Sequence, residues 1–353
     1  MTKRVAFVGS AGIPNRYGGF EAFLEHCAPR LAAECVVTVT CDSRLYDDRA
    51  ALFAGVRRRF IGVPANGAWS VVHDLLAFAR VFQEADYIVV LGVSGGAWFP
   101  IFRLACDATG KRVLVNIDGV EWRRAKFSAG RRVLLRLFDA LAQSCAHRVI
   151  YDNAALLRYV LPWCRPKAVE IAYSGDHVLR CEGVRPDPSS ALTICRVEPE
   201  NNIEMMVEGF ISSNLRRYTI VGNWDKSQYG RDLRRKWNHE PRLELLDPIY
   251  DSVALARLRE SCGIYLHGHS VGGTNPSLVE MLYYDCRLLC FDCDFNRMTA
   301  GDCADYFDAS QELAKRLGET SGADSSSRDA RRGAYTGAGI AAAYLSLLIG
   351  GTP

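Results

Sequence analysis

Residues 4–42, RVAFVGSAGIPNRYGGFEAFLEHCAPRLAAECVVTVTCD, hold the pattern that decides the fold. The short apolar run 4–10 is followed by the helix-like stretch 20–34 and by a second apolar run, 36–42. Two parallel strands need a crossover connection, which is usually a helix. The stretch therefore predicts a strand, a helix and a second strand, with a glycine-rich turn between the first strand and the helix.

The same pattern recurs along the chain. Short runs that are apolar on both faces and end in Gly, Asp or Asn are typical of buried parallel strands. Such runs are 85–95, 111–119, 147–153 and 168–176 in the first half. A second series of strand-like runs, which alternates with helical stretches, follows at 191–197, 216–224, 242–249, 263–270 and 287–294. The segment 177–190 lacks periodicity and contains Pro186 and Pro188, so we predict a connector there. Two doubly wound α/β domains are expected.

These runs suggest domain limits. We place an N-terminal domain at 1–180, a second domain at 181–333 and a C-terminal segment at 334–353. The polar, glycine-rich segment 318–337 predicts a loop, and the apolar run 339–350 predicts a helix that crosses back to the first domain. The strand ends of both sheets would then line an interdomain cleft, where ligands bind in such folds.

Composition narrows the class of protein. A chain of 353 residues is too long for one ordinary core, and its net charge of +3 gives no reason to expect nucleic acid as the main partner. The start MTKRVAFVGS has no signal-like apolar region, and no run is long enough to span a bilayer. The 13 cysteines are scattered, which favours a reducing compartment. We expect a cytoplasmic protein.

Two groups of residues resemble metal ligands. His267 and His269 face the same way on a strand end, but no third ligand follows in the sequence. A cysteine group lies in and after a strand-like run, where buried free cysteine is common; it comprises Cys286, Cys290, Cys293 and Cys303. A zinc site is the alternative interpretation. We expect no metal at either place.

Gly18 and Gly19 precede the first helix, where free backbone N–H groups and the helix dipole favour an anion. The loop is neither GxGxxG nor a Walker loop with its lysine, which disfavours a dinucleotide oxidoreductase and a P-loop NTPase. A tight turn that needs glycine is the structural alternative.

Asp118 ends the strand-like run 111–117, and Glu121 follows it. A carboxylate at the carboxyl end of a parallel strand can accept hydrogen bonds from sugar hydroxyls. An ordinary Asp-Gly turn is the alternative. The next segment, 123–138, alternates arginines with apolar residues at helical spacing. It fits an anionic lipid surface, but we favour packing of its apolar face against the sheet.

In the second half, Arg196 lies just beyond a strand, where a guanidinium can hold phosphate oxygens. The stretch HGHSVGGTNPSLVEM contains a glycine-rich turn that leads into a helix. Asn275, Pro276 and Ser277 suit the start of that helix, and Glu280 is expected in its first turn. A ribose or donor-sugar site fits this arrangement.

Seven ordered motifs resemble the family-4 retaining glycosyltransferases, and more narrowly the bacterial branch that includes rhamnosyltransferases of capsule, exopolysaccharide and O-antigen assembly. They are GIPNRYGGFE, NIDGVEWRRAKFS, YSGD, RVEPENNIEMM, IVGNW, LHGHSVGGTNPSLVEM and FDCDFNR. The resemblance implies the GT-B fold, a nucleotide-sugar donor, no cofactor and no essential metal.

The resemblance also implies roles for single residues. Gly18 and Gly19 match the glycine loop near the diphosphate, and Asp118 falls where many relatives carry a histidine beside the donor sugar. Arg196 matches the phosphate-binding arginine, and Glu280 the second glutamate of an E-x7-E pattern, which holds ribose hydroxyls.

Two positions depart from the family pattern. The first glutamate of E-x7-E would fall at Gly272, and the usual phosphate lysine at Asn201. We hypothesise that the backbone N–H groups of Gly272, Gly273 and Thr274 compensate. The expected catalytic residues are Asp118, Arg196 and Glu121, and the expected donor-binding residues are Gly18, Gly19, Asn201, Gly272, Gly273, Thr274, Asn275, Ser277 and Glu280.

The sequence thus predicts a hexosyltransferase. We expect a sugar such as rhamnose to pass from a TDP- or UDP-linked donor to a saccharide acceptor in the synthesis of bacterial surface polysaccharide. The expected acceptor is lipid-linked and lies at the inner face of the cell membrane. Two alternatives remain open: a nucleotide-sugar epimerase of GT-B architecture, and a non-catalytic nucleotide-sugar-binding partner.

Overall fold

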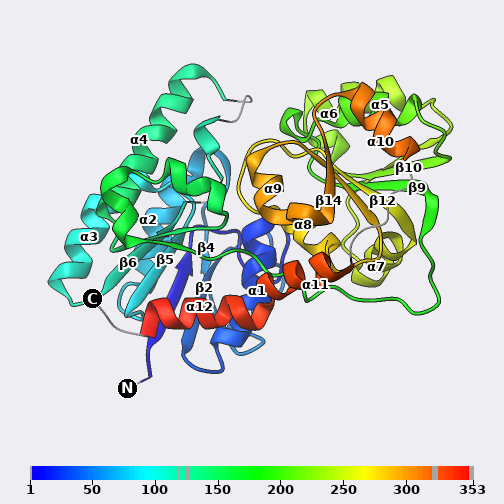
Figure 1. The fold of residues 1–353 in the computed structure, drawn as a ribbon. Coiled ribbons are helices and arrows are strands. Elements are labelled where there is room, and N and C mark those ends of the chain that lie inside the picture. Colours follow the sequence, from blue (N-terminus) through cyan, green and yellow to red (C-terminus); the bar gives the residue numbers. More distant parts are fainter. Residues whose placement is uncertain (1, 118, 124–126, 320–324, 350–353) are drawn as a thin grey trace. The chain divides into compact units, whose positions relative to one another are not determined.

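The computed structural model describes residues 2–117, 119–123, 127–319 and 325–349. The chain forms two compact units. Unit 1 contains Met1–Ser174 together with Thr336–Pro353, and unit 2 contains Gly175–Tyr335. The expected limits were 180 and 333, a few residues from these. Figure 1 shows an α/β arrangement of strands and helices in each unit.

Unit 1 is built on an eight-stranded sheet with the order β3-β4-β2-β1-β5-β6-β7-β8. All neighbours are parallel except the short β3, which pairs antiparallel with β4. The strands are β1 (Arg4–Val8), β2 (Val36–Asp42), β3 (Leu52–Phe53), β4 (Val56–Ile61), β5 (Tyr87–Leu91), β6 (Arg112–Asn116), β7 (Arg148–Tyr151) and β8 (Ala168–Glu170).

Helices cover this sheet. α2 (Ser70–Val81), α3 (Phe99–Ala108) and α4 (Ala129–Cys145) form one layer (Figure 1), while α1 (Gly19–Leu31) packs against α12 (Gly337–Ile349). Short 3₁₀ turns join them: η1 (Gly67–Trp69), η2 (Gly96–Trp98), η3 (Glu121–Arg123), η4 (Ala154–Tyr159) and η5 (Pro162–Lys167).

The last helix completes the core of unit 1. The ring of Tyr344 in α12 lies 5.8 Å from that of Phe7 in β1 and 5.4 Å from that of Phe23 in α1, centroid to centroid. All three side chains are buried. Aromatic pairs at this spacing add to the area that they bury. The two ends of the sequence therefore share one hydrophobic core.

Unit 2 has a six-stranded parallel sheet with the order β11-β10-β9-β12-β13-β14. The strands are β9 (Asp187–Ile194), β10 (Arg217–Val221), β11 (Leu243–Leu246), β12 (Cys262–His267), β13 (Arg287–Phe291) and β14 (Ala304–Phe307). The helices are α5 (Ile203–Ile211), α6 (Gln228–Trp237), α7 (Ser252–Ser261), α8 (Pro276–Met281), α9 (Asp294–Ala300), α10 (Ser310–Gly318) and α11 (Ser325–Ala334), with the 3₁₀ turns η6 (Pro199–Asn201), η7 (Trp224–Lys226) and η8 (Gly301–Cys303).

Part of the segment expected as a loop, 318–337, is helical. α11 occupies Ser325–Ala334, and its arginines bind the turn that follows α8. The Arg328 guanidinium is buried and donates to the carbonyl oxygens of Tyr284 (2.7 Å) and Cys286 (2.8 Å). The polar composition that suggested a loop is thus used for tertiary hydrogen bonds.

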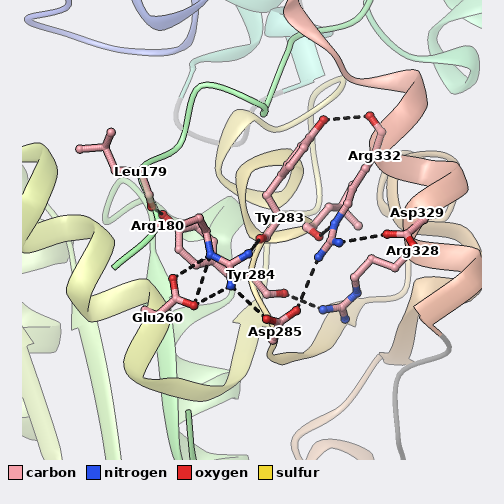
Figure 2. A network of polar contacts seen from close by, with 10 residues as sticks. Leu179, Arg180, Glu260, Tyr283, Tyr284, Asp285, Arg328, Asp329 and Arg332 are labelled. Carbon is pink, nitrogen blue, oxygen red and sulfur yellow. Dashed lines mark hydrogen bonds and ion pairs between the residues drawn. The ribbon is translucent and has the colours of Figure 1, made fainter. Parts of the chain in front are cut away.

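Two more arginines fix the same turn (Figure 2). Arg180 donates to the carbonyl oxygen of Tyr283 and binds the carboxylates of Glu260 and Asp285 at 2.7–3.0 Å. Arg332 donates to the carbonyl oxygen of Leu282 at 2.7 Å. Carbonyl groups at a helix end lack intrahelical partners and are stabilised by cations. The arginines therefore anchor the carboxyl end of α8, the helix that carries Glu280.

Candidate functional site

The centre of unit 2 contains a topological switch point. β9 and β12 are neighbours, but the chain leaves β9 toward β10 on one side and leaves β12 toward β13 on the other. Ligands bind at the carboxyl ends of the strands at such a point. The segments that follow these strands, 195–202 and 268–275, contain six of the twelve expected site residues: Arg196, Asn201, Gly272, Gly273, Thr274 and Asn275.

Arg196 stands two residues beyond β9 and is half-buried. Within the residues that the structure describes, its guanidinium has no ion pair and no hydrogen bond. An arginine that is held in place at a strand end and is not neutralised by the protein can bind a phosphate through two N–H groups. The predicted role of Arg196 thus has a suitable geometry.

Asn201 is buried, and its side chain is directed into the protein. Its Nδ2 donates to the carbonyl oxygen of Arg196 (2.8 Å), and its Oδ1 lies 2.9 Å from Nδ1 of His269. Since an amide oxygen only accepts, Nδ1 of His269 carries the hydrogen. Both polar groups of Asn201 are therefore engaged within the protein, although the sequence had suggested a direct contact with the donor.

Gly272 lies beside the same histidine. Its φ is +156°, and a Cβ added there would lie 2.7 Å from Nε2 of His269. That distance is far below van der Waals contact, so no larger side chain fits at position 272 while His269 keeps this place. The missing glutamate at Gly272 and the missing lysine at Asn201 are thereby connected through His269.

The start of α8 is capped as its sequence predicts. Asn275 is the N-cap residue, and its Oδ1 accepts from the N–H of Ser277 at 3.0 Å. This bond satisfies a backbone donor at the helix start. Asn275 and the N–H of Ser277 thus hold the turn in shape, while Gly272, Gly273 and Thr274 form the segment between β12 and this cap.

Glu280 was expected in the first turn of its helix, but α8 is only six residues long and Glu280 lies in its last turn. The side chain is buried and is held from two sides. Its Oε2 pairs with the buried Arg259 of α7, and its Oε1 lies 3.2 Å from Nε2 of His177. Burial opposes the charge of Arg259, but the Glu280 carboxylate keeps the pKa of the guanidinium above its ordinary value. The carboxylate of Glu280 is thus fixed between a guanidinium and an imidazole.

His267, the second histidine of the motif, is a core residue. It is the last residue of β12 and is buried, and its ring stacks near Tyr265 at a centroid distance of 6.0 Å. Burial lowers the pKa of its imidazole to about 3, so the ring is neutral at physiological pH. Among the described residues, no group of three or more His, Cys, Asp or Glu side chains is placed to hold a metal ion.

In unit 1, Gly18 is the N-cap residue of α1 and Gly19 its first residue. Glu21 follows in the first turn, is buried, and accepts a hydrogen bond from the N–H of Ala11 at 2.6 Å. A carboxylate therefore already interacts with this loop. The neighbouring Arg16 is exposed and makes no ion pair in the described ranges. The diphosphate contact at the two glycines stays a prediction.

Asp118 lies outside the described residues. Glu121 begins η3, and the next residue, Trp122, ties this turn to α4: its Nε1 donates to Oδ2 of Asp139 at 3.1 Å. Gln143 donates to the other oxygen of Asp139 at 2.8 Å. Burial raises the pKa of Asp139, and the two hydrogen bonds oppose that shift. The inner face of α4 thus sets the position of Glu121.

Several of these residues could not be selected from the sequence. Arg259 reads like any other arginine of a surface helix, and His177 only follows the YSGD motif. Asp74, at the start of α2, is buried next to Gly9 and Gly95, which follow β1 and β5. Burial raises the pKa of Asp74 to about 8, so this carboxyl group is protonated near neutral pH. Only burial separates these residues from ordinary surface charges.

The chain was also compared with known protein families, curated proteins and solved structures. Residues 2–176 match a family described as a domain of unknown function (DUF1972). A search of curated proteins found no match. Solved structures match over nearly the whole chain, at low sequence identity.

Three examples are taken from the structures that cover at least 98% of this chain. Sucrose-phosphate synthase from Thermosynechococcus elongatus has 13% identity, 98% coverage of both chains and a TM-score of 0.75. HepE from Anabaena, solved with UDP and glucose, has 14% identity, covers 99% of this chain and 96% of its own, and has a TM-score of 0.64. The α,α-trehalose 6-phosphate synthase from Burkholderia multivorans has 11% identity, 99% and 98% coverage, and a TM-score of 0.66. The predicted GT-B fold, with two Rossmann-like domains, is confirmed.

Proposed function

We propose that this chain, which has the fold of GT-B glycosyltransferases, transfers a sugar from a nucleotide-diphosphate donor to a saccharide acceptor. The observation that carries the proposal is Arg196: a half-buried guanidinium at the switch point of unit 2, without an ion pair among the described residues. The similarity to HepE, which was solved with UDP and glucose, supports a donor of this class.

In this proposal Arg196 stabilises the departing diphosphate. Charge-assisted hydrogen bonds from a positioned guanidinium lower the energy of a leaving group as its charge develops. Glu280 holds the ribose hydroxyls, and the N–H groups of Gly272 and Gly273 add donors near the diphosphate. Asp118 orients the sugar or the acceptor. No metal is needed, because the protein supplies the compensating charge.

The finer features follow from the resemblance of the motifs. We propose that transfer retains the anomeric configuration, with the leaving phosphate assisting the incoming hydroxyl. We further propose rhamnose on a TDP or UDP carrier as the sugar, and bacterial surface polysaccharide, such as capsule or O-antigen, as the product. The enzyme would act at the cytoplasmic face of the membrane.

Ligand-induced stabilisation tests the proposal. We expect UDP- or TDP-sugars to raise the melting temperature, because a ligand at one hundred times its Kd adds about 2.7 kcal/mol of stability. A panel of nucleotide sugars, with NADH and ATP as controls, is measured by differential scanning fluorimetry. Stabilisation by none of the sugars, or equally by the controls, would contradict the proposal. An epimer that accumulates without acceptor would instead identify an epimerase, and binding without transfer or hydrolysis a non-catalytic partner.

We also propose that the acceptor is lipid-linked and that unit 1 contacts the lipid surface through α4. The expected packing of the apolar face of this helix against the sheet is not observed. Val133 is 71% exposed, and Leu134 and Leu137 are exposed beside it, whereas Asp139 and Gln143 face the protein. The reason is that α4 uses Asp139 and Gln143 to hold η3, which turns Val133, Leu134 and Leu137 outward, while the other large apolar residues of the helix are at least half-buried.

Charge supports lipid as the partner. Arg131, Arg132 and Arg136 flank the exposed apolar residues of α4 and make no ion pair among the described side chains. Each basic residue near an anionic bilayer contributes about 1 kcal/mol. Other large apolar side chains are exposed on the neighbouring helices α2 and α3; they are Leu76, Ile101 and Leu104. In the described part of the chain, no helix is long and apolar enough to cross a membrane.

Vesicle binding tests the lipid contact. We expect the protein to sediment with vesicles of phosphatidylcholine and phosphatidylglycerol, and far less with phosphatidylcholine alone. The double variant Leu134→Asp, Leu137→Asp should bind at least about tenfold more weakly, because two charges would enter the apolar layer. Val253→Asp, at an exposed apolar position of α7, is the matched control. Equal sedimentation of both variants would show that α4 is not the contact.

A further inference from the structure

We infer that His269 binds the diphosphate of the donor beside Arg196, and that Asn201 is the residue that positions it. The inference rests on the proposed function and names a donor-binding residue within it. Its structural basis is one chain of contacts: from the Arg196 carbonyl through the Asn201 amide to the His269 imidazole, and from there to Gly272.

The backbone of His269 is fixed from two sides. Its carbonyl oxygen accepts a hydrogen bond from Nδ2 of the buried Asn296 at 2.8 Å. The next residue, Ser270, donates its N–H to the carbonyl oxygen of Glu200 at 2.9 Å. Because β12 ends at His267 and the chain is held again at Ser270, the imidazole has a defined place at the switch point. Such fixation is what a binding residue requires.

The ring orientation is defined as well. Nδ1 donates to Asn201, so the other nitrogen, Nε2, lies on the side of Gly272 and the turn that leads to α8. Nε2 donates a hydrogen bond when the ring is protonated, and a neighbouring diphosphate favours the protonated ring. His269 would then act as a second cation, next to Arg196.

This arrangement accounts for both departures from the family pattern. The amide of Asn201 is engaged by the Arg196 carbonyl and by Nδ1 of His269, so this residue orients the imidazole. The glycine at position 272 leaves the space that the imidazole occupies. A purely structural histidine would also explain the burial of the ring, but it predicts that nucleoside diphosphate affinity does not depend on Asn201 through His269.

Binding of UDP and of dTDP, measured by isothermal titration calorimetry on the full chain, tests the inference. We expect His269→Ala to lower the affinity for the tighter-binding of the two nucleotides by about 10- to 100-fold, the usual effect of losing a hydrogen bond to a charged group. Asn201→Ala should weaken it as well, but it should have no further effect in the His269→Ala background. His239→Ala, at an exposed position of the same unit, should change nothing.

His269→Gln roughly keeps the size of the side chain but cannot be charged. This variant replaces His269→Ala in the measurement if the alanine variant does not fold. We expect it to lose most of the same affinity. Unchanged affinity in a folded His269 variant, or additive effects of the two alanine substitutions, would overturn the inference while leaving the proposed function intact. A wild-type protein that binds neither nucleotide would contradict the proposed function, and this inference with it.

Discussion

Glu280→Ala is expected to destabilise unit 2 by about 3–5 kcal/mol, because it leaves the guanidinium of Arg259 buried without its partner. Arg259 and Glu280 are both buried, so water cannot replace the lost carboxylate. Hydrogen–deuterium exchange of peptides from α7 and α8, measured across a urea series, reports the loss where it arises. Stability lost only in unit 1 would contradict the reason given.

Two variants separate the buried charge from other effects. Glu204 pairs with Lys236 at an exposed site of the same unit, so Glu204→Ala should cost less than about 1 kcal/mol. The double variant Arg259→Met, Glu280→Leu removes both buried charges and should recover much of the lost stability, although not donor binding. If Glu280→Ala lowers the free energy of unfolding no more than Glu204→Ala does, then leaving Arg259 without Glu280 does not destabilise unit 2.

Arg196→Ala is expected to lower turnover by about 10²- to 10³-fold, the usual effect of removing one donor to a developing negative charge. Stability should change little, since the guanidinium has no ion pair within the described residues. Turnover is measured with the nucleotide sugar that stabilises the protein best, both as transfer and as slow hydrolysis of the donor.

Arg257→Ala serves as the matched control, because Arg257 is an exposed arginine of α7. It should leave turnover within about twofold of wild type. Arg196→Lys keeps the charge but not the planar pair of N–H groups, so it should recover only part of the activity. An Arg196→Ala variant with near-normal turnover would remove Arg196 from the proposed mechanism.

The alternation of strands and helices could be predicted because parallel strands buried on both faces leave a strong signal. The runs 4–10 and 36–42 contain β1 and β2. β4 was not predicted, because three successive arginines break its apolar pattern. Arg58, one of them, is buried and donates to the carbonyl oxygen of Ala50 at 2.8 Å. An arginine satisfied in this way can lie in a strand that composition alone would place at the surface.

The candidate site could also be predicted only in part. Arg196 and Glu280 could be selected because they follow strands whose ends meet in any doubly wound sheet. The contacts that Arg196 and Glu280 make with other residues could not be predicted from the sequence. Asn201 was expected to touch the donor, and only the three-dimensional contact with His269 shows that its amide is already engaged. The outward direction of Leu134 and Leu137 on α4 likewise depends on which face of the helix binds η3, which helical periodicity does not specify.

The contribution of α12 to the core of unit 1 has a consequence for synthesis of the protein. Phe7 and Phe23 cannot complete their packing until Tyr344 has left the ribosome. By then the whole of Gly175–Tyr335 has been made, which takes on the order of 10–30 s at about 5–20 residues per second. Unit 2 can therefore fold first. Until α12 has been made, the N-terminal part of unit 1 has an incomplete core and exposes apolar strands. Nascent chains of this protein should depend on chaperones mainly through their N-terminal part.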